Sequence, residues 1–219
     1  MVGMKPNQLI PLHMEYRHRF KVEFEFLLQQ STFAKIVFKN SDLLFKDEDS
    51  AFFSSLHNLF GCSFEGMALG LSRVWDVRQG DVDLISIPNL VTLFSEYNFL
   101  GCRSLREGEA DRNTYEALYS DPLRGRLRVV RTEAFAHNIQ VGTSKDRKKS
   151  DIKGMQEFNL INGAVLEFCA KTINLLYSLN NQLNLHGFQK GKSLDDLKVE
   201  YTKNHIAFLR HFAPDIVEP

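Results

Sequence analysis

The chain of 219 residues is long enough for one sizeable domain, and a hydrophobic fraction of 43% with 18 Phe supports a real core. Lys+Arg and Asp+Glu are both 27, so no global field draws the protein to nucleic acid or membranes, and an anionic ligand would need a local basic patch. Three cysteines without a C-x-x-C spacing argue against a disulfide framework or a zinc site. No apolar run approaches the ~20 residues of a membrane span, and we expect a soluble cytoplasmic protein without a signal peptide.

The N-terminal half reads as two long helices. The first is expected from Leu12 to about Lys39, because apolar side chains recur at helical spacing in Tyr16, Phe20, Phe24 and Leu27. The second is expected from about Asp49 to Val77, and its interior glycines predict close backbone packing at Gly61, Gly66 and Gly70. Near its end, Arg73 and Asp76 have the spacing of an ion pair within one helix; helping to position an active-site helix is the alternative.

The second half of the sequence contains several residues that are typical of helix N-termini. Ser86 can cap a short helix with Pro88 in its first turn, and Asp121 before Pro122 predicts the start of the helix that leads to Arg131. The most regular helix has a strict three-four alternation of apolar residues, which predicts the seam of an antiparallel bundle or a coiled-coil-like pair: Phe158, Ile161, Val165, Phe168, Thr172, Leu175 and Leu179. Ser193 can cap a last helix that Pro214 stops.

Strand signals are nearly absent, so the sequence predicts an all-α fold. We expect an antiparallel helical bundle of five to six helices. Residues 1–11 would form an N-terminal extension, residues 12–192 the bundle, and residues 193–219 a C-terminal helix packed on it.

The stretch RTEAFAHN, residues 131–138, carries the main chemical candidate. Arg131 has a planar fork of donors that suits phosphate oxygens, and His137 can move a proton near neutral pH. Together they could cleave RNA, with the arginine on the phosphate and the histidine on the proton. Six positions turn an ideal helix by roughly 120° away from the start. The two side chains therefore converge only if the helix bends or ends, or if a partner subunit completes the site.

The neighbours of this pair are basic. Glu133 lies four residues before His137 and could hold its imidazole, while Thr132 and Asn138 flank the pair. Candidate contacts to an RNA backbone are Arg124 and Arg128 on the same helix and Lys145, Arg147, Lys148, Lys149 and Lys153 in the loop that follows. The alternative is that the arginines are a solvated face and the lysines an ordinary loop.

Two stretches together resemble the HEPN superfamily, in particular its abortive-infection (phage-defence) branch. One is LRVVRTEAFAHN, and the other is GMALGLSRVWDVRQGDVDLISIPNLVTLF. With the helix order, the resemblance covers most of residues 12–185. It implies a helical bundle that dimerises and brings two Arg/His motifs together, and a metal-independent ribonuclease of toxin or phage-defence type. Arg131 and His137 are then the catalytic pair.

The resemblance also sets out the alternatives. Many active members have Asn, Asp or His directly after the arginine, where Thr132 stands here, so a reduced or lost activity stays open. Ile139 replaces the tyrosine that one toxin subgroup carries two residues after the histidine, so modification of that tyrosine is not implied. We expect RNA as the ligand, a homodimer, a possible antitoxin or regulatory protein, and no cofactor. The rival reading is a non-catalytic dimer module that binds a protein partner or a nucleotide.

Other candidates have simpler explanations. Neither His13 with His18 nor His205 with His211 has the spacing of a helical two-histidine metal site, and no metal is expected. Cys169 falls beside the seam and is predicted to be a small buried hydrophobe.

Overall fold

The computed structural model describes residues 6–46, 51–76, 85–91, 109–130, 162–182 and 192–218. Their helices are α1 (Pro6–Lys39), α2 (Ser41–Leu44), α3 (Ala51–Trp75), α5 (Glu109–Ser120), α6 (Pro122–Val130), α8 (Asn162–Gln182) and α9 (Leu194–Leu209). Residues 87–91 add one short helical segment. No strand occurs in these ranges, so the predicted all-α class is confirmed.

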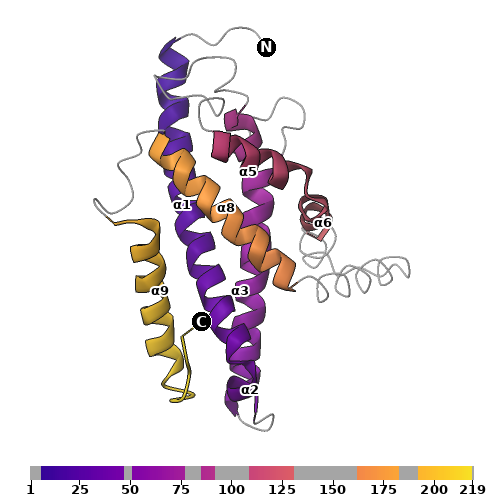
Figure 1. Ribbon diagram of the computed structural model, residues 1–219, viewed down its shortest axis with the longest axis vertical. Coiled ribbons are helices and arrows are strands. Elements are labelled where there is room, and N and C mark those ends of the chain that lie inside the picture. The colour runs from indigo at the N-terminus through magenta and orange to yellow at the C-terminus, as the bar shows by residue number, and fades with distance from the viewer. Residues whose placement is uncertain are drawn as a thin grey trace.

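The helices pack around α1. The long helices α1 and α3 run antiparallel, α8 crosses them diagonally, and α9 lies beside α1 on the side away from α6 (Figure 1). Helix α9 runs in the same direction as α1 (Figure 1). In the part of the chain that the structure describes, no helix combines the length and the apolar character needed to cross a bilayer.

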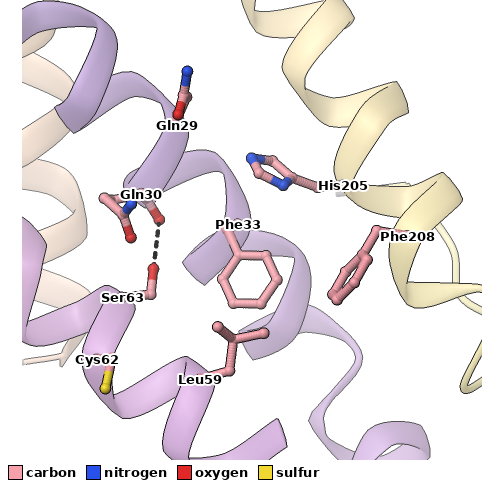
Figure 2. Close-up of a pocket in the computed structure, with 8 residues that line it drawn as sticks. All are labelled: Gln29, Gln30, Phe33, Leu59, Cys62, Ser63, His205 and Phe208. Carbon is pink, nitrogen blue, oxygen red and sulfur yellow. Dashed lines mark hydrogen bonds between the residues drawn. The ribbon is translucent and has the colours of Figure 1, made fainter. Parts of the chain in front are cut away.

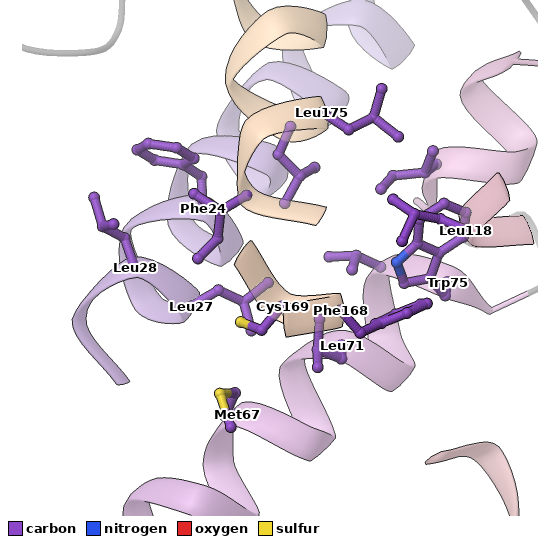
Figure 3. Packing of buried hydrophobic residues seen from close by; sticks show 14 of the residues in the cluster. Phe24, Leu27, Leu28, Met67, Leu71, Trp75, Leu118, Phe168, Cys169 and Leu175 are labelled. Atoms are coloured by element: carbon purple, nitrogen blue, oxygen red, sulfur yellow. The ribbon is translucent and has the colours of Figure 1, made fainter. Parts of the chain in front are cut away.

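The predicted apolar stripes form the main core. All four residues of the α1 stripe are buried: Tyr16, Phe20, Phe24 and Leu27. They meet buried side chains of α3 and α8, among them Met67, Leu71, Trp75, Phe168, Cys169 and Leu175 (Figure 3). The described part of the predicted seam is buried too, from Val165 to Leu179. Burial of this many large side chains is the main stabilising term of the fold.

Two of the three glycines of α3 confirm the prediction of close packing. A Cβ on Gly70 would lie 2.9 Å from Cδ2 of Leu27, and one on Gly66 would lie 3.1 Å from Cζ of Phe26. These glycines therefore let α1 approach α3 closely. Gly61 has nothing within 4 Å of such a Cβ, so the prediction is wrong there.

The predicted helix starts are confirmed by their hydrogen bonds. Oδ1 of Asp121 accepts from N of Leu123 at 2.8 Å, and Oγ of Ser86 accepts from N of Asn89 at 3.4 Å. Ser193 forms a full capping box with Asp196. The ends of two helices differ from expectation: α1 begins six residues before Leu12, at Pro6, and α9 ends at Leu209, before the chain reaches Pro214.

A second, smaller core lies where α9 covers the C-terminal part of α1. Its buried members are Phe33, Ile36, Val37, Leu56, Ile206, Leu209 and Ile216. The tail after α9 is fastened to the end of α1 by the buried side chain of Asn40, which accepts from N of Val217 and donates to O of Val217, each at 3.0 Å. The residues after α9 are thus part of the folded unit.

Candidate functional site

Most of the predicted site falls outside the described residues. This holds for Arg131, Thr132, Glu133, His137 and Asn138, and for the loop residues Lys145, Arg147, Lys148, Lys149 and Lys153. Arg124 and Arg128 belong to α6, one turn apart. Since α6 ends at Val130, directly before Arg131 in the chain, the described part of the candidate site is the corner where α5 and α6 meet α3, named here the α6 corner.

Helix α6 is anchored to the core by its apolar face. Leu123 and Leu127 are buried, and Oγ of the buried Ser72 on α3 donates to the backbone oxygen of Leu127 at 3.1 Å. This bond uses a carbonyl in the last turn of α6, where helix carbonyls lack partners within the helix. The position of α6 on α3 is therefore fixed only four residues before Arg131.

Trp75 joins the α6 corner to α8. Its Nε1–H donates to Oγ1 of Thr172 at 3.0 Å, and both side chains are buried. The indole stacks on Tyr115 of α5, with ring centroids 6.0 Å apart and planes at 22°. Burial raises the pKa of Tyr115 to about 12, so its hydroxyl stays protonated. The corner thus has a rigid aromatic base that three helices share.

Arg124 is the charged group of the α6 corner. Its guanidinium carbon lies 3.9 Å from the centre of the Tyr119 ring, which is a cation–π contact. Its Nη1 is buried, and among the described residues it has no hydrogen-bond partner. Arg124 also lines a cavity of about 80 Å³ between α3 and α6, together with Ser72 and Asp76. This space suits ordered water or a small polar group that accepts from the guanidinium.

A second charged contact differs from the prediction. Arg73 does not pair within α3 but reaches α1, where its Nε donates to Oε1 of Glu23 at 2.7 Å and its Nη2 to Oε2 at 3.0 Å. The guanidinium also lies 5.7 Å from the Phe26 ring centre. Glu23 is 8% exposed, so this bidentate pair ties α3 to α1 as a partly buried contact and takes Arg73 out of the candidate site.

A larger cavity of about 390 Å³ lies on the other side of the molecule, between α1, α3 and α9 (Figure 2). Its lining is Gln29, Gln30, Phe33, Leu59, Cys62, Ser63, His205 and Phe208. Burial lowers the pKa of His205 from its ordinary value of 6.5, against a smaller opposing effect of a hydrogen bond to the backbone of Gln29. A neutral imidazole leaves this lining without a formal charge, so the cavity does not fit the phosphates of a nucleotide.

The two described cysteines differ in burial. Cys169 is fully buried, and burial raises the pKa of its thiol to about 12, which confirms the predicted role of a small hydrophobe. Cys62 is exposed. Within the described ranges, no group of three or more His, Cys, Asp or Glu side chains is arranged to hold a metal ion.

Comparison with protein-family models, curated proteins and solved structures finds no match for this chain.

The sequence pattern found Arg124 but not its surroundings. Tyr119 and Trp75 were not recognised as its neighbours, although Tyr115 and Tyr119 have the i, i+4 spacing that places both on one face of α5. The contact between them and Arg124 depends on how α5, α6 and α3 cross, which no local spacing specifies.

Proposed function

We propose that the chain is a metal-independent endoribonuclease of the HEPN type that acts in phage defence or toxin-like growth arrest. Arg131 holds the scissile phosphate, and His137 serves as general acid or base. The 2′-hydroxyl oxygen forms a bond to phosphorus while the bond to the 5′-oxygen breaks, which leaves a cyclic phosphate. One proton leaves the 2′-oxygen and one reaches the 5′-oxygen, so the step consumes no water.

The observation that carries the proposal is the state of Arg124 on an anchored α6. The helix that leads to the motif is bonded to α3 through Ser72, and its described residues include three arginines and no acidic side chain. Arg124 forms no ion pair within the described residues, and one of its donors is buried without a partner. A guanidinium with a free donor in a fixed position suits a phosphate oxygen of an RNA backbone.

The remaining residues have supporting roles in this proposal. Thr132, Glu133 and Asn138 orient or flank the catalytic pair, and the basic residues from Lys145 to Lys153 support the RNA backbone. A homodimer brings two motifs together, which removes the geometric difficulty of an arginine and a histidine on different faces of one helix. An antitoxin or regulatory protein would restrain the activity in the resting cell.

Growth of cells that overexpress the protein tests the proposal. Wild type is expected to arrest growth, whereas Arg131→Ala and His137→Ala restore it while accumulating to the same level. His211→Ala is the matched control, because His211 is exposed beyond the end of α9 and should leave the arrest unchanged. Harmless wild-type protein, or arrest that both motif variants retain, would contradict the proposal.

A non-catalytic interaction module is the second candidate, and one observation favours it. Phe208 in the last turn of α9 and Phe212 just after the helix are 44% and 38% exposed, and their rings pack edge to face with centroids 5.2 Å apart. Exposed aromatic pairs are typical of surfaces that bind other proteins. This candidate predicts that Phe208→Ser abolishes the biological effect and that the Arg131 and His137 variants do not.

A further inference from the structure

An aromatic ladder runs from the core to the surface at the α6 corner. It starts at Trp75, which is 3% exposed, continues through Tyr115 and ends at Tyr119, which is 37% exposed. The Tyr115 and Tyr119 centroids are 5.5 Å apart with planes at 30°, and the guanidinium of Arg124 lies over Tyr119. The ladder therefore ends in an exposed aromatic ring with a partly buried guanidinium packed against it.

The ladder holds this pair in place before any ligand arrives. Trp75 is fixed by its bond to Thr172, Tyr115 by the indole, and Arg124 by the Tyr119 ring and by its position on the anchored α6. Side chains that are already ordered lose little conformational entropy on binding. A rigid surface of this kind favours ligands with flat rings.

The positive charge of the arginines on α6 limits the chemical class of the ligand. One donor of the Arg124 guanidinium, Nη1, has no hydrogen-bond partner in the described ranges, and Arg126 on the same helix is exposed. The ligand should therefore combine flat rings with negative charge. Nucleic acid has both, but paired bases hide their faces inside the duplex, so the ligand must carry an unpaired base.

We propose that Tyr119 and Arg124 form a binding site for an unpaired base of single-stranded RNA, with the base stacked on the Tyr119–Arg124 pair and a backbone phosphate beside the guanidinium. The choice of RNA rests on the proposed function, which the site deepens by naming single strands as the substrate class. Tyr119 acts in binding and has no part in the chemical step.

Binding of a fluorescein-labelled RNA single strand of about 12 nucleotides, followed by anisotropy, tests this proposal. The full chain carries His137→Ala so that no cleavage occurs during the titration. Tyr119→Ala should weaken binding of the single strand on the order of tenfold, since stacking on one aromatic ring has that effect. Tyr119→Phe keeps the ring and should bind as the parent does. Arg126→Ala, a loss of one exposed charge on the same helix, should weaken binding only severalfold.

A second variant and a second ligand keep the test independent of folding. Arg124→Lys preserves the charge but loses the planar guanidinium. It should therefore weaken binding of the single strand severalfold and leave binding of an RNA duplex of the same length unchanged. The melting temperature of each variant shows whether it is folded. Equal affinity of Tyr119→Ala and its parent for the single strand would overturn the proposal. So would a preference of the parent for the duplex, or the absence of RNA binding.

The outcomes separate this site from the catalytic proposal. If wild type cleaves RNA and Tyr119→Ala binds and cleaves single strands equally well, the stacking site is wrong and the nuclease stands. If wild type cleaves no RNA but binds single strands through Tyr119, the stacking site stands and the nuclease is wrong. If wild type neither binds nor cleaves RNA, both are wrong. Saturable binding of an acidic peptide such as oligoglutamate, without binding of RNA, would assign the surface to a protein partner.

Discussion

The α6 corner is held to α3 and α8, and the α9 region to α1, by different forces. At the α6 corner, buried polar bonds join α3 to α6 and α8, through Ser72 with Leu127 and through Trp75 with Thr172. At α9, packing of an apolar cluster is the main contact with α1. The hydrogen bonds lie at the edges of this cluster, in the Ser193 capping box and between Asn40 and the tail. Directional hydrogen bonds therefore fix the position of the corner, whereas close packing of apolar side chains mainly fixes the position of α9.

The two regions also differ in charge. The corner contains a partly buried arginine with one guanidinium donor unpaired among the described residues, whereas the cavity beside α9 has no formally charged side chain in its lining. Polar bonds that fix orientation are therefore found where the proposed chemistry needs a fixed cation. This difference predicts that loosening the corner impairs RNA cleavage, and that loosening α9 impairs stability alone.

The largest effect on stability is expected from the core that both regions share. Phe168 is 2% exposed and packs against Trp75 with centroids 5.9 Å apart. Phe168→Ala should lower the free energy of unfolding by about 3–5 kcal/mol, because a cavity is left behind. Urea titration followed by circular dichroism measures this loss. A loss within 1 kcal/mol, roughly that of a surface substitution, would contradict the packing described for this core.

Thr172→Val should loosen the α6 corner selectively. The substitution keeps the shape of the side chain but leaves the buried Nε1–H of Trp75 without an acceptor, which costs about 1–3 kcal/mol. We expect the RNA cleavage rate to fall as well, at a temperature where the variant is fully folded, because the ladder supports Arg124. Full cleavage by the folded variant would show that the corner does not position the substrate.

Ser193→Ala provides the matching change at α9. Losing the capping box should lower the free energy of unfolding by about 1 kcal/mol, the usual cost of removing a side-chain cap. Unlike Thr172→Val, it should leave RNA cleavage by the folded protein unchanged. A parallel loss of cleavage in both variants would remove the distinction between the two regions.

The smallest expected effect is a dependence of protein stability on pH that arises from His205. Its pKa in the folded protein is below the ordinary 6.5, so the unfolded chain takes up the proton first as the pH falls. The contribution of His205 to the free energy of unfolding should be fully present above about pH 6.5. It should be lost as the pH falls from there to the pKa of His205 in the folded protein. Urea midpoints of wild type and His205→Gln at about pH 7.5 and about pH 5.5 should show a smaller decrease for the variant.

The features that the sequence predicted correctly have local causes. Asp121 before Pro122 and Ser193 before two aspartates are start signals that act within one turn, and the α1 stripe follows from the 3.6-residue period. Close packing at Gly66 and Gly70 follows from the missing side chain, but the sequence did not separate these positions from Gly61, where nothing lies within 4 Å.

The missed features join residues that are far apart in the chain. Arg73 was expected to pair within α3, but its partner Glu23 is 50 positions away on α1. The Tyr119–Arg124 contact and the bonds from Asn40 to the tail likewise depend on how helices cross and where a chain end returns. Local spacing contains no information about those crossings. The motif residues Arg131 and His137 remain a prediction from the sequence, since they lie outside the described residues.

Cleavage of end-labelled total RNA and transfer RNA by the purified protein, with EDTA present throughout, tests the central claim most directly. The assay compares wild type with His137→Ala and with His211→Ala. We predict cleavage by wild type and His211→Ala that yields cyclic phosphate ends, and a loss in His137→Ala on the order of a hundredfold or more. Equal cleavage by wild type and His137→Ala, or the absence of cleavage by folded wild-type protein, would contradict the account.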